Sequence, residues 1–391
     1  MSLHGEYREE LYQWIWEKLE FSTAGLQTTD GVAVRIIENG TLNHGAGPDF
    51  SAAHILIGGR RWFGSVEIHK TAADWRAHRH HEDPAYNRVI LHVVVEENGP
   101  LKVMREDGTS PPTMLLKPYL NKRVYNLLRK MGKPSLACGG KTALIHQKAF
   151  EIQVEKAHTE YLDYKVEELL RGYDPTLNIS EAWKSALVLQ VYRTLGIPSN
   201  REPMGKLASL LTQKRHVMDG LKTFIDEVEA TAFGKICDQE FDWIRTGIRP
   251  ANRPQKRVKQ AASIHWHLAQ YSLDFFYKNS PKESWSTLID AIEEASLPGA
   301  QSLGILYATV YIPALHLLGR LLQYRKLTEQ ASDAWASESL PVPRAVQRPF
   351  RDAGFEIDNK LKKIGLAHQY KRYCKEQQCH RCEVFKSAIH S

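Results

Sequence analysis

The sequence predicts an α+β fold in which a mixed sheet domain, residues 1–135, precedes an all-helical domain, residues 136–391. Three observations lead to this prediction. Short segments before residue 100 alternate apolar and polar residues, which is the period of a half-buried strand. After Lys133-Pro134 the apolar residues recur at helical spacing instead. The chain has 391 residues, 42% of them hydrophobic, which is long enough for two domains that each bury a core.

The first predicted elements are a helix and a strand. Residues Glu6 to Leu19 place Leu11, Ile15 and the neighbouring tryptophans on one stripe of an amphipathic helix. Val32 to Ile37 then has the composition of a strand, and Asn39-Gly40 ends it. The helix is therefore expected to cover the sheet that follows.

A β-hairpin is predicted next. Its strands are Phe50 to Ile57 and Trp62 to His69, and Gly58-Gly59 between them tolerates the positive φ values of a tight reversal. Alternate residues of a strand face the same side of a sheet. Glu67 and His69 are therefore expected to share one face.

The register of this hairpin decides whether two nearby acids can meet. A loop of the two glycines alone would place Asp49 opposite Ile68, on the wrong face for Glu67. A three-residue loop that includes Arg60, or a bulge, would place Asp49 opposite His69 and diagonal to Glu67, about 7 Å away. We predict the longer loop or a bulge, with the two carboxylates close enough to share one cation.

A short helix is predicted after the hairpin, because Thr71 and Asp74 have the spacing of a capping box. On a regular helix His78 and His80 would point in roughly opposite directions, which opposes a zinc pair. That objection weakens if the helix frays before Asp83-Pro84.

The next predicted strand, Val89 to Glu96, turns Val89, Leu91, Val93 and Val95 toward the core and carries His92 on its other face, near the acids of the hairpin. Seven of the 17 histidines lie between His44 and His92. Imidazole titrates near neutral pH and is a common metal ligand, so this enrichment favours a functional site over scattered core histidines.

Pro48-Asp49, followed by Glu67-Ile68-His69-Lys70, resembles the signature of PD-(D/E)XK nucleases. The resemblance implies a restriction-endonuclease-like sheet domain and a metal-dependent nuclease that hydrolyses DNA or RNA. It further implies one Mg²⁺ or Mn²⁺ ion held by Asp49, Glu67 and the backbone carbonyl of Ile68.

The resemblance also implies roles for the residues around this ion. His69 stands where the family has its lysine and would act as general base or phosphate clamp, with Lys70 as its substitute and His92 close by. The helix before the sheet would lend an acid, Glu9 or Glu10. Because His69 replaces the lysine, the identity of the base stays open.

Two other functions remain open. The first is a zinc or manganese hydrolase whose ion is held by His69, His78 or His80, and His92. The second is a non-catalytic nucleic-acid-binding or scaffold protein. Beyond the nuclease signature, four motifs resemble a bacterial family known only as a domain of unknown function: N-x-x-x-GPDF from Asn43, DW-x-x-H-x-H from Asp74, RP-x-N-x-P from Arg249 and YC-x4-C-x2-C from Tyr373.

The helical half begins with a helix that Ser180 caps, on which Trp183 and Leu187 lie on one stripe and Gly196 ends the pattern. The apolar run Leu303 to Leu318 is short for a membrane span and contains a proline and a histidine, which favours a buried helix. Further helices are predicted at Asn200 to Leu211, Lys222 to Phe233, Val258 to Tyr271 and Trp285 to Ala295.

The charge distribution indicates an anionic partner. The formal net charge is +7, and the stretches Lys117 to Lys133 and Trp243 to Leu273 carry basic residues without any acid. Such stretches suit a phosphate backbone, although solvated helix faces explain them equally well. The residues expected to contact nucleic acid are Arg249, Arg253, Lys256 and Arg257.

The C-terminal cysteines form the second chemical feature. Cys374, Cys379 and Cys382 have the spacing C-x4-C-x2-C, which suits Zn²⁺ or an iron-sulfur cluster. Either cofactor needs a fourth ligand, for which Cys138 is the first choice and His380 the second. Cys237 is expected to be a small buried hydrophobe.

The cellular setting is predicted from what the sequence contains. Its first twenty residues are charged and helical in pattern, unlike a secretory signal peptide. Five cysteines with three close together fit a reducing compartment better than a disulfide framework. We therefore expect a cytoplasmic protein without a membrane partner.

Overall fold

The computed structural model describes residues 9–130, 136–213, 220–234, 241–338, 340, 342–358, 361 and 363–390. The chain divides into two compact units. Unit 1 comprises Met1–Glu155, Val342–Leu361 and Leu366–Ser391, and unit 2 comprises Lys156–Pro341 and Lys362–Gly365. Residues near the C-terminus thus join the unit that holds the sheet, whereas the sequence-based division between residues 135 and 136 assigned them to the helical half.

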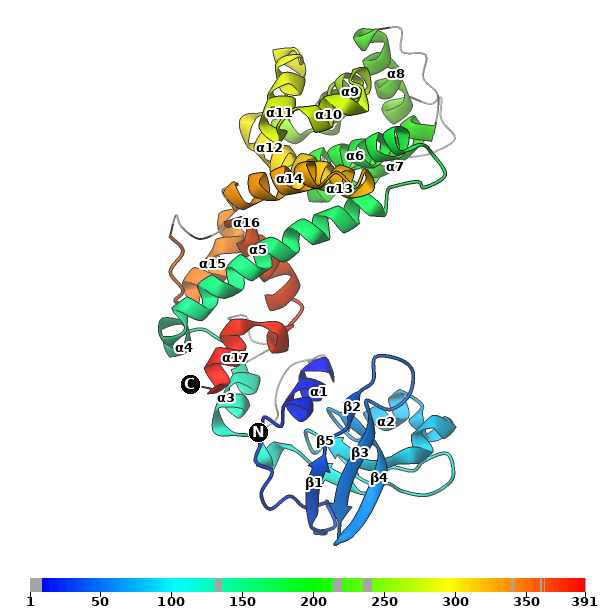
Figure 1. Ribbon diagram of the computed structural model, residues 1–391, viewed down its shortest axis with the longest axis vertical. Coiled ribbons are helices and arrows are strands. Elements are labelled where there is room, and N and C mark those ends of the chain that lie inside the picture. Colours follow the sequence, from blue (N-terminus) through cyan, green and yellow to red (C-terminus); the bar gives the residue numbers. More distant parts are fainter. Residues whose placement is uncertain are drawn as a thin grey trace. The chain divides into compact units, whose positions relative to one another are not determined.

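Unit 1 is built on one mixed sheet, shown in blue and cyan in Figure 1, whose strand order is β1-β3-β4-β5-β6, with β2 paired to β3. Strands β1 to β4 pair antiparallel, whereas β5 runs parallel to β4 and β6 parallel to β5. The strands are β1 Val34–Glu38, β2 Thr41–Leu42, β3 Phe50–Ile57, β4 Arg60–His69, β5 Val89–Val94 and β6 Thr113–Leu115. Because helices dominate the rest of the chain, the α+β prediction is confirmed.

The hairpin β3–β4 has a two-residue loop and a bulge. Ile57 pairs with Arg60, so the predicted three-residue loop is wrong. The register then shifts by one residue between Ala53 and Phe50, where Ala52 adopts a positive φ of 55°. The alternative prediction of a bulge is therefore confirmed, but Phe50 pairs with Val66, which carries Asp49 beside Glu67 and not opposite His69.

The two faces of the sheet are covered differently. Helix α1, Glu9–Glu17, packs Leu11 and Ile15 into the hydrophobic core that contains Val66 and Ile68 of β4. On the other face, the short helix α2, Asp74–Ala77, buries Trp75. Glu67 and His69 of β4 lie on this second face because residues of a strand alternate in direction.

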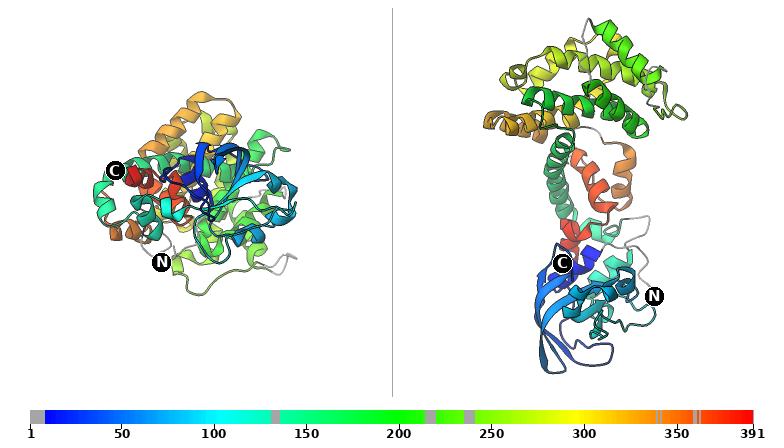
Figure 2. Two further views of the ribbon diagram at one scale, coloured as in Figure 1. Left: turned by 90° about the horizontal axis from the view of Figure 1, so that it is seen from below. Right: turned by 90° about the vertical axis from the view of Figure 1, so that its right-hand side faces the viewer.

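Most of the remaining helices of unit 1 come from distant parts of the chain and enter the same core as the sheet. Trp14 of α1 contacts Phe385 near the C-terminus, with ring centroids 5.9 Å apart. The elements that enter this core are η3 Lys117–Tyr119, α3 Lys122–Lys130, α4 Lys141–Ile145, the first turns of α5 Gln147–Leu170, α15 Arg344–Asp352, the end of α16 Lys363–His368, the π-helix η7 Gln369–Cys374, η8 Cys379–Arg381 and α17 Glu383–His390. The short helices η1 His80–Glu82 and η2 Pro84–Arg88 lie between β4 and β5 instead, and Tyr86 packs with Trp75 on the other face of the sheet. Two further views of the ribbon are given in Figure 2.

Helices joined by loops make up the described residues of unit 2. The first helix of the predicted series begins earlier than expected, because Asn178 and not Ser180 caps it by accepting the N–H of Glu181. The elements are the rest of α5, α6 Ile179–Leu195, α7 Ile197–Gln213, α8 Leu221–Phe233, η4 Pro250–Asn252, α9 Pro254–Gln270, α10 Leu273–Lys278, α11 Pro281–Asp290, η5 Glu294–Ser296, α12 Ala300–Leu306, η6 Tyr307–Tyr311, α13 Ile312–Leu321 and α14 Arg325–Ser337.

One helical stretch in the described part of the chain, Ala300–Leu321, is long and apolar enough to cross a bilayer. Its most apolar window is 67% buried inside the structure. Within it, the carbonyl of Ala314 accepts a hydrogen bond from the indole N–H of Trp183, at 2.6 Å. The stretch therefore packs as a core helix of unit 2, as its proline and histidine indicated.

Candidate metal centre

The two predicted carboxylates lie side by side. The backbone N–H of Asp49 donates to Oε2 of Glu67 at 2.9 Å, and the backbone N–H of Ile68 donates to Oδ2 of Asp49 at 2.9 Å. The bulge in β3 produces this reciprocal contact, because it moves Asp49 by one position relative to an unbroken ladder. The two acids thus arrive from opposite arms of the hairpin, and the carboxylate of each accepts a backbone N–H from the other arm.

Both carboxyl groups are hard to ionise in the absence of a cation. Burial, together with the neighbouring charge of Glu67, raises the pKa of Asp49 to about 7. Burial raises the pKa of Glu67 to about 8, although the N–H of Asp49 opposes that rise. A divalent cation between the two groups would supply the charge that their surroundings lack.

His69 and His92 form a buried imidazole pair beside these acids. Nδ1 of His69 and Nε2 of His92 lie 3.0 Å apart, and both side chains are completely buried. Burial lowers the pKa of His69 to about 2 and that of His92 to about 3, so both rings are neutral at physiological pH. A proton on Nδ1 of His69 then leaves Nε2 of that ring with an available lone pair.

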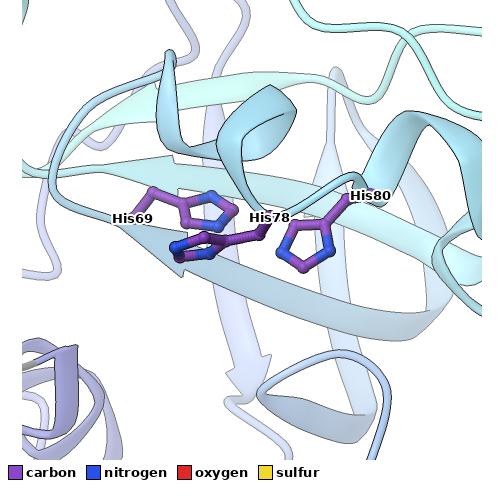
Figure 3. Close-up of side chains that lie close together, drawn as sticks. All are labelled: His69, His78 and His80. Atoms are coloured by element: carbon purple, nitrogen blue, oxygen red, sulfur yellow. The ribbon is translucent and has the colours of Figure 1, made fainter.

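His78 and His80 join His69 because the helix before them is short. Helix α2 ends at Ala77, and Arg79 has a left-handed φ of 62° before η1 begins. This break removes the objection that a regular helix would send His78 and His80 in opposite directions. As Figure 3 shows, the three imidazoles converge, and one ring nitrogen from each lies within 4.8 Å of the others.

Glu67 connects the histidines to the carboxylates. Its Oε1 lies 3.4 Å from Nε2 of His69 and 3.1 Å from Nε2 of His80. Both nitrogens are buried, and neither has a hydrogen-bond partner among the described residues. Unpaired imidazole nitrogens that face one carboxylate oxygen at this separation have the arrangement of ligands around a single metal ion.

Helix α1 contributes one acid and one amide to the site. Nε2 of Gln13 donates to Oδ1 of Asp49 at 2.7 Å, and Oε1 of Glu9 lies 3.8 Å from Nδ1 of His78. Burial raises the pKa of Glu9, while the charge of His78 opposes that rise. Of the two acids that the nuclease resemblance offered for this helix, Glu9 is therefore the one near the centre.

Two other expected participants are arranged differently. The backbone of Ile68 meets Asp49 through its N–H, whereas the predicted contact to the ion used its carbonyl. The carbonyl of Ile68 remains a predicted ligand. Lys70 follows the end of β4, where strand alternation directs its side chain away from the face that carries His69, as its place in the sequence indicated.

The four residues expected to bind nucleic acid belong to unit 2 and fall into two groups. Arg249, Arg253 and Lys256 are exposed, and the last two line a hollow of about 500 Å³ together with Arg245. Arg257 is buried instead, and its guanidinium donates to Asn252, Gln260 and Ser302. Arg257 thus supports the fold and is turned away from a surface ligand.

The four cysteines expected around the second metal all lie in unit 1 and line one cavity. Cys138 comes from the turn before α4, and Cys374, Cys379 and Cys382 come from η7, η8 and the residue after it. His380, the other candidate for the fourth ligand, does not line this cavity. Cys237 lies outside the described residues.

Sequence reasoning missed Gln13 and Tyr86. Gln13 follows Glu9 by four residues, so both point from one face of α1, and this helical spacing is the signal that could have found it. The ring of Tyr86 stacks on His80 with centroids 3.7 Å apart. Only the fold of residues 78–88 brings these two rings together, so no pattern in the sequence indicates that contact.

Comparison of the chain with curated proteins and with solved structures finds no match. A family model does match it over residues 9–238, which is more than half of the chain. The matched segment contains both carboxylates, all the histidines of the metal centre and Cys138, but ends before the C-terminal cysteines. The chain therefore belongs to the family described as "Protein of unknown function (DUF2851)".

Proposed function

We propose that this protein is a metal-dependent phosphodiesterase of the nuclease type, with its divalent ion held by Asp49, Glu67, His69 and His80. One observation carries the proposal. Oε1 of Glu67 lies 3.4 Å from Nε2 of His69 and 3.1 Å from Nε2 of His80, and both nitrogens are buried without a hydrogen bond among the described residues. Groups that have given up water and have no protein partner are usual at functional sites.

The order of the secondary structure supports a nuclease-like core of the restriction-endonuclease type. With the two-residue strand β2 set aside, a helix precedes the antiparallel strands β1, β3 and β4, and a short helix then leads to the parallel strand β5. Asp49 precedes the second of these strands and Glu67 lies on the third, which is where the resemblance to PD-(D/E)XK nucleases implies the two acids. Glu9 on the first helix adds the acid that the same resemblance implies.

The ligand atoms favour Mn²⁺ over Mg²⁺. Magnesium binds oxygen ligands and retains several waters, whereas imidazole nitrogens suit transition metals. A set of two carboxylates and two imidazoles combines both kinds of ligand, and manganese accepts the combination. Such an ion, when bound, would lower the pKa of a water molecule and neutralise charge on a phosphodiester.

The side chains around the ion divide into ligands and supports. The low pKa of His69 makes it a poor proton acceptor and a good neutral ligand, which argues against the general-base role that the nuclease signature implied. With Nε2 of His69 on the ion, its Nδ1 would carry the proton and donate it to Nε2 of His92, which would fix the ring orientation and tautomer. Gln13 holds the carboxylate of Asp49 in the same way from helix α1.

Exposed basic residues of unit 2 support nucleic acid as the substrate. Arg245, Arg253 and Lys256 line one hollow, and no acid is among its lining residues. Cations on an open surface bind a phosphate backbone without reading its sequence. We assign Arg249, Arg253 and Lys256 to this contact. The four described cysteines form no disulfide, which suits action in a reducing cytoplasm.

Metal titration and cleavage assays on the full chain test the proposal. Wild-type protein is expected to bind one Mn²⁺ and to cleave single-stranded or double-stranded DNA or RNA in its presence. Glu67→Gln should abolish both properties, whereas Glu82→Gln, at an exposed acid of the same segment, should preserve them. Manganese binding that survives Glu67→Gln, or cleavage that survives it, would contradict the proposal.

A zinc hydrolase centred on the histidines is the second candidate, because His69, His78 and His80 alone bring three ligand nitrogens together. Three protein ligands with one open position are typical of catalytic zinc. This candidate predicts one tightly bound zinc ion that Asp49→Asn leaves in place and that His78→Ala removes. The nuclease proposal predicts the reverse pattern with manganese.

A further inference from the structure

The cavity lined by the four cysteines is the strongest feature that the phosphodiesterase proposal leaves unused. Cys138 and Cys374 are separated by more than half of the chain, yet their side chains line the same cavity as Cys379 and Cys382. All four are free thiols. A fold that gathers four thiols from distant segments without forming a disulfide provides a set of metal ligands.

The spacing of the sulfurs argues against a single zinc ion. A zinc ion bound about 2.3 Å from each thiolate holds the sulfurs of a tetrahedral site roughly 3.8 Å apart. Among the described residues, the group that brings three possible ligand atoms within 4.8 Å of one another is His69, His78 and His80, and the cysteines form no such group. A cofactor that contains several metal atoms would bridge the wider spacing.

The size and lining of the cavity agree with such a cofactor. Its volume is about 270 Å³, far more than the roughly 10 to 15 Å³ that one water molecule requires by the same measure. Aromatic side chains enclose it on several sides, among them Phe150, Phe350, Phe355, Tyr373 and Phe385. A single ion would leave most of this space to water, whereas a core of iron and sulfide atoms would occupy it against an apolar wall.

Two buried glutamines are hydrogen-bonded to each other, and one of them, Gln369, donates to two of the sulfurs. Nε2 of Gln369 lies 3.6 Å from Sγ of Cys374 and 3.7 Å from Sγ of Cys382. Oε1 of Gln369 accepts a hydrogen bond from Nε2 of Gln153 at 2.8 Å. Oε1 of Gln153 in turn accepts the backbone N–H of Glu383, also at 2.8 Å. Both glutamines are buried, so the pair fixes an N–H donor toward the thiols.

Donors of this kind are a feature of iron-sulfur sites, in which N–H groups bonded to the sulfurs tune the cluster. The segment that carries Gln369 and Cys374 is π-helical, and π-helical turns are frequent at functional sites. Burial, with the neighbouring charge of Cys382, raises the pKa of Cys138 to about 12. Thiols that resist ionisation alone are deprotonated once they coordinate a metal.

We propose that Cys138, Cys374, Cys379 and Cys382 bind an iron-sulfur cluster that fastens the C-terminal segment to the residues before α4 within unit 1. The cluster is a cofactor separate from the ion at Glu67. The cysteine spacing C-x4-C-x2-C, with a distant fourth cysteine, also occurs in plant-type [2Fe–2S] sites. Gln369 acts as a positioning residue that donates to two of the ligating sulfurs.

Purification of the full chain under anaerobic conditions tests this proposal. The protein is expected to be coloured and to contain iron and acid-labile sulfide in equal amounts, two or four of each per chain, with the spectroscopic signature of a cluster by Mössbauer spectroscopy. Cys379→Ser should lose most of the iron and sulfide. Cys237→Ser, at the one cysteine of the sequence outside this set, should retain both.

Three outcomes would overturn the proposal. The first is one zinc per chain without sulfide. The second is the absence of iron and sulfide even after reconstitution with Fe²⁺ and sulfide. The third is full iron and sulfide in both Cys379→Ser and Cys138→Ser.

Should the cysteine variants not fold, Gln369→Leu with all four cysteines intact answers the same question, because a changed Mössbauer or redox signature requires a cluster beside this amide. Glu67→Gln should keep the cluster, so failure of either proposal is visible separately.

Discussion

The two candidate cofactor sites of unit 1 differ in how the chain builds them. The ligands of the metal centre lie within about thirty residues, on one hairpin and the loop that follows, apart from supports on α1. The cysteines come from two separate segments of the unit, Cys138 from the first and the other three from the last, and meet only when the unit has folded. The backbone of one hairpin and its loop therefore positions the first site, whereas packing between segments far apart in the sequence creates the second.

This difference also separates the chemistry of the two sites. At the metal centre, ligand atoms approach within 3.1 Å and 3.4 Å of one carboxylate oxygen, which fits one ion. At the cysteine site, the thiols stand around a cavity of about 270 Å³, which fits a cofactor with several atoms. The two proposals thus differ in the kind of cofactor that each set of side chains would hold, one ion at the metal centre and a cluster at the cysteines.

The largest expected effect is the independent loss of each site. Glu67→Gln should reduce manganese-dependent cleavage by at least about 100-fold, because removal even of a group that supports a ligand costs 10- to 100-fold. Cys379→Ser should leave the cleavage measured per folded molecule nearly unchanged. Cleavage rates, manganese binding and iron content are measured on both variants. If one substitution removed both cofactors, the view of two separate sites would be wrong.

The second effect is a loss of stability with rising pH that the two buried carboxyl groups of the metal centre should produce. The folded-state pKa values of Asp49 and Glu67, about 7 and 8, lie above their ordinary values. Without metal, their contribution to the free energy of unfolding is complete at low pH and is lost as the pH rises to about 8. Each proton changes the slope by at most about 1.4 kcal/mol per pH unit.

Denaturant unfolding in the presence of a chelator, from pH 4 to pH 8, measures this dependence. The free energy of unfolding of Asp49→Asn should rise relative to wild type across the range, because the variant has no carboxyl to ionise. Saturating Mn²⁺ should reverse the difference, since the ion stabilises the ionised carboxylate. Buried His69 and His92 have the opposite effect, because they reduce the free energy of unfolding as the pH falls below about 6.5. Wild type and Asp49→Asn both contain them, so they do not change the difference between the two proteins. Parallel curves with and without the ion would contradict the assignment.

The third effect concerns the support of a ligand. His92→Phe keeps a ring of similar size but removes the acceptor for Nδ1 of His69, which should weaken manganese binding by about 10- to 100-fold. His92→Gln keeps an acceptor and should recover part of the affinity. Calorimetric titration of both variants checks this order. Equal affinities for the two variants would show that His92 only fills space.

Periodicity predicted much of the fold that surrounds the metal centre. The strand Phe50–Ile57 has its predicted bounds, and alternation correctly placed Glu67 and His69 on one face. The bulge was predicted, but its position was not, because only the left-handed backbone at Ala52 locates it. His80 was predicted only as an alternative ligand for a similar reason. The turn at Arg79, which brings its ring to the site, has no strong signal in the sequence.

Contacts between distant segments were beyond such reasoning. The pairing of Gln369 with Gln153 spans 216 residues, and an amide in a helix is ordinarily expected to be solvated. The same limit explains Arg257, whose position in a basic stretch suggested a surface contact although its guanidinium is buried among polar partners. Cys138 could be suggested only because the chain contains few cysteines.

The smallest expected effect is that of Gln369→Leu at the cysteine site. Leucine has a similar volume but cannot donate to Cys374 or Cys382, so each sulfur loses one weak hydrogen bond while all four ligands remain. N–H donors stabilise the more negative, reduced cluster, and their loss should lower the reduction potential with little change in iron content. Redox titration of the cluster measures the shift, with Gln147→Leu as the control, because the amide of Gln147 donates to the carbonyl of Glu356 and not to a sulfur. A lowered potential together with unchanged manganese binding would place Gln369 at the cluster, whereas an unchanged potential would leave it a packing residue.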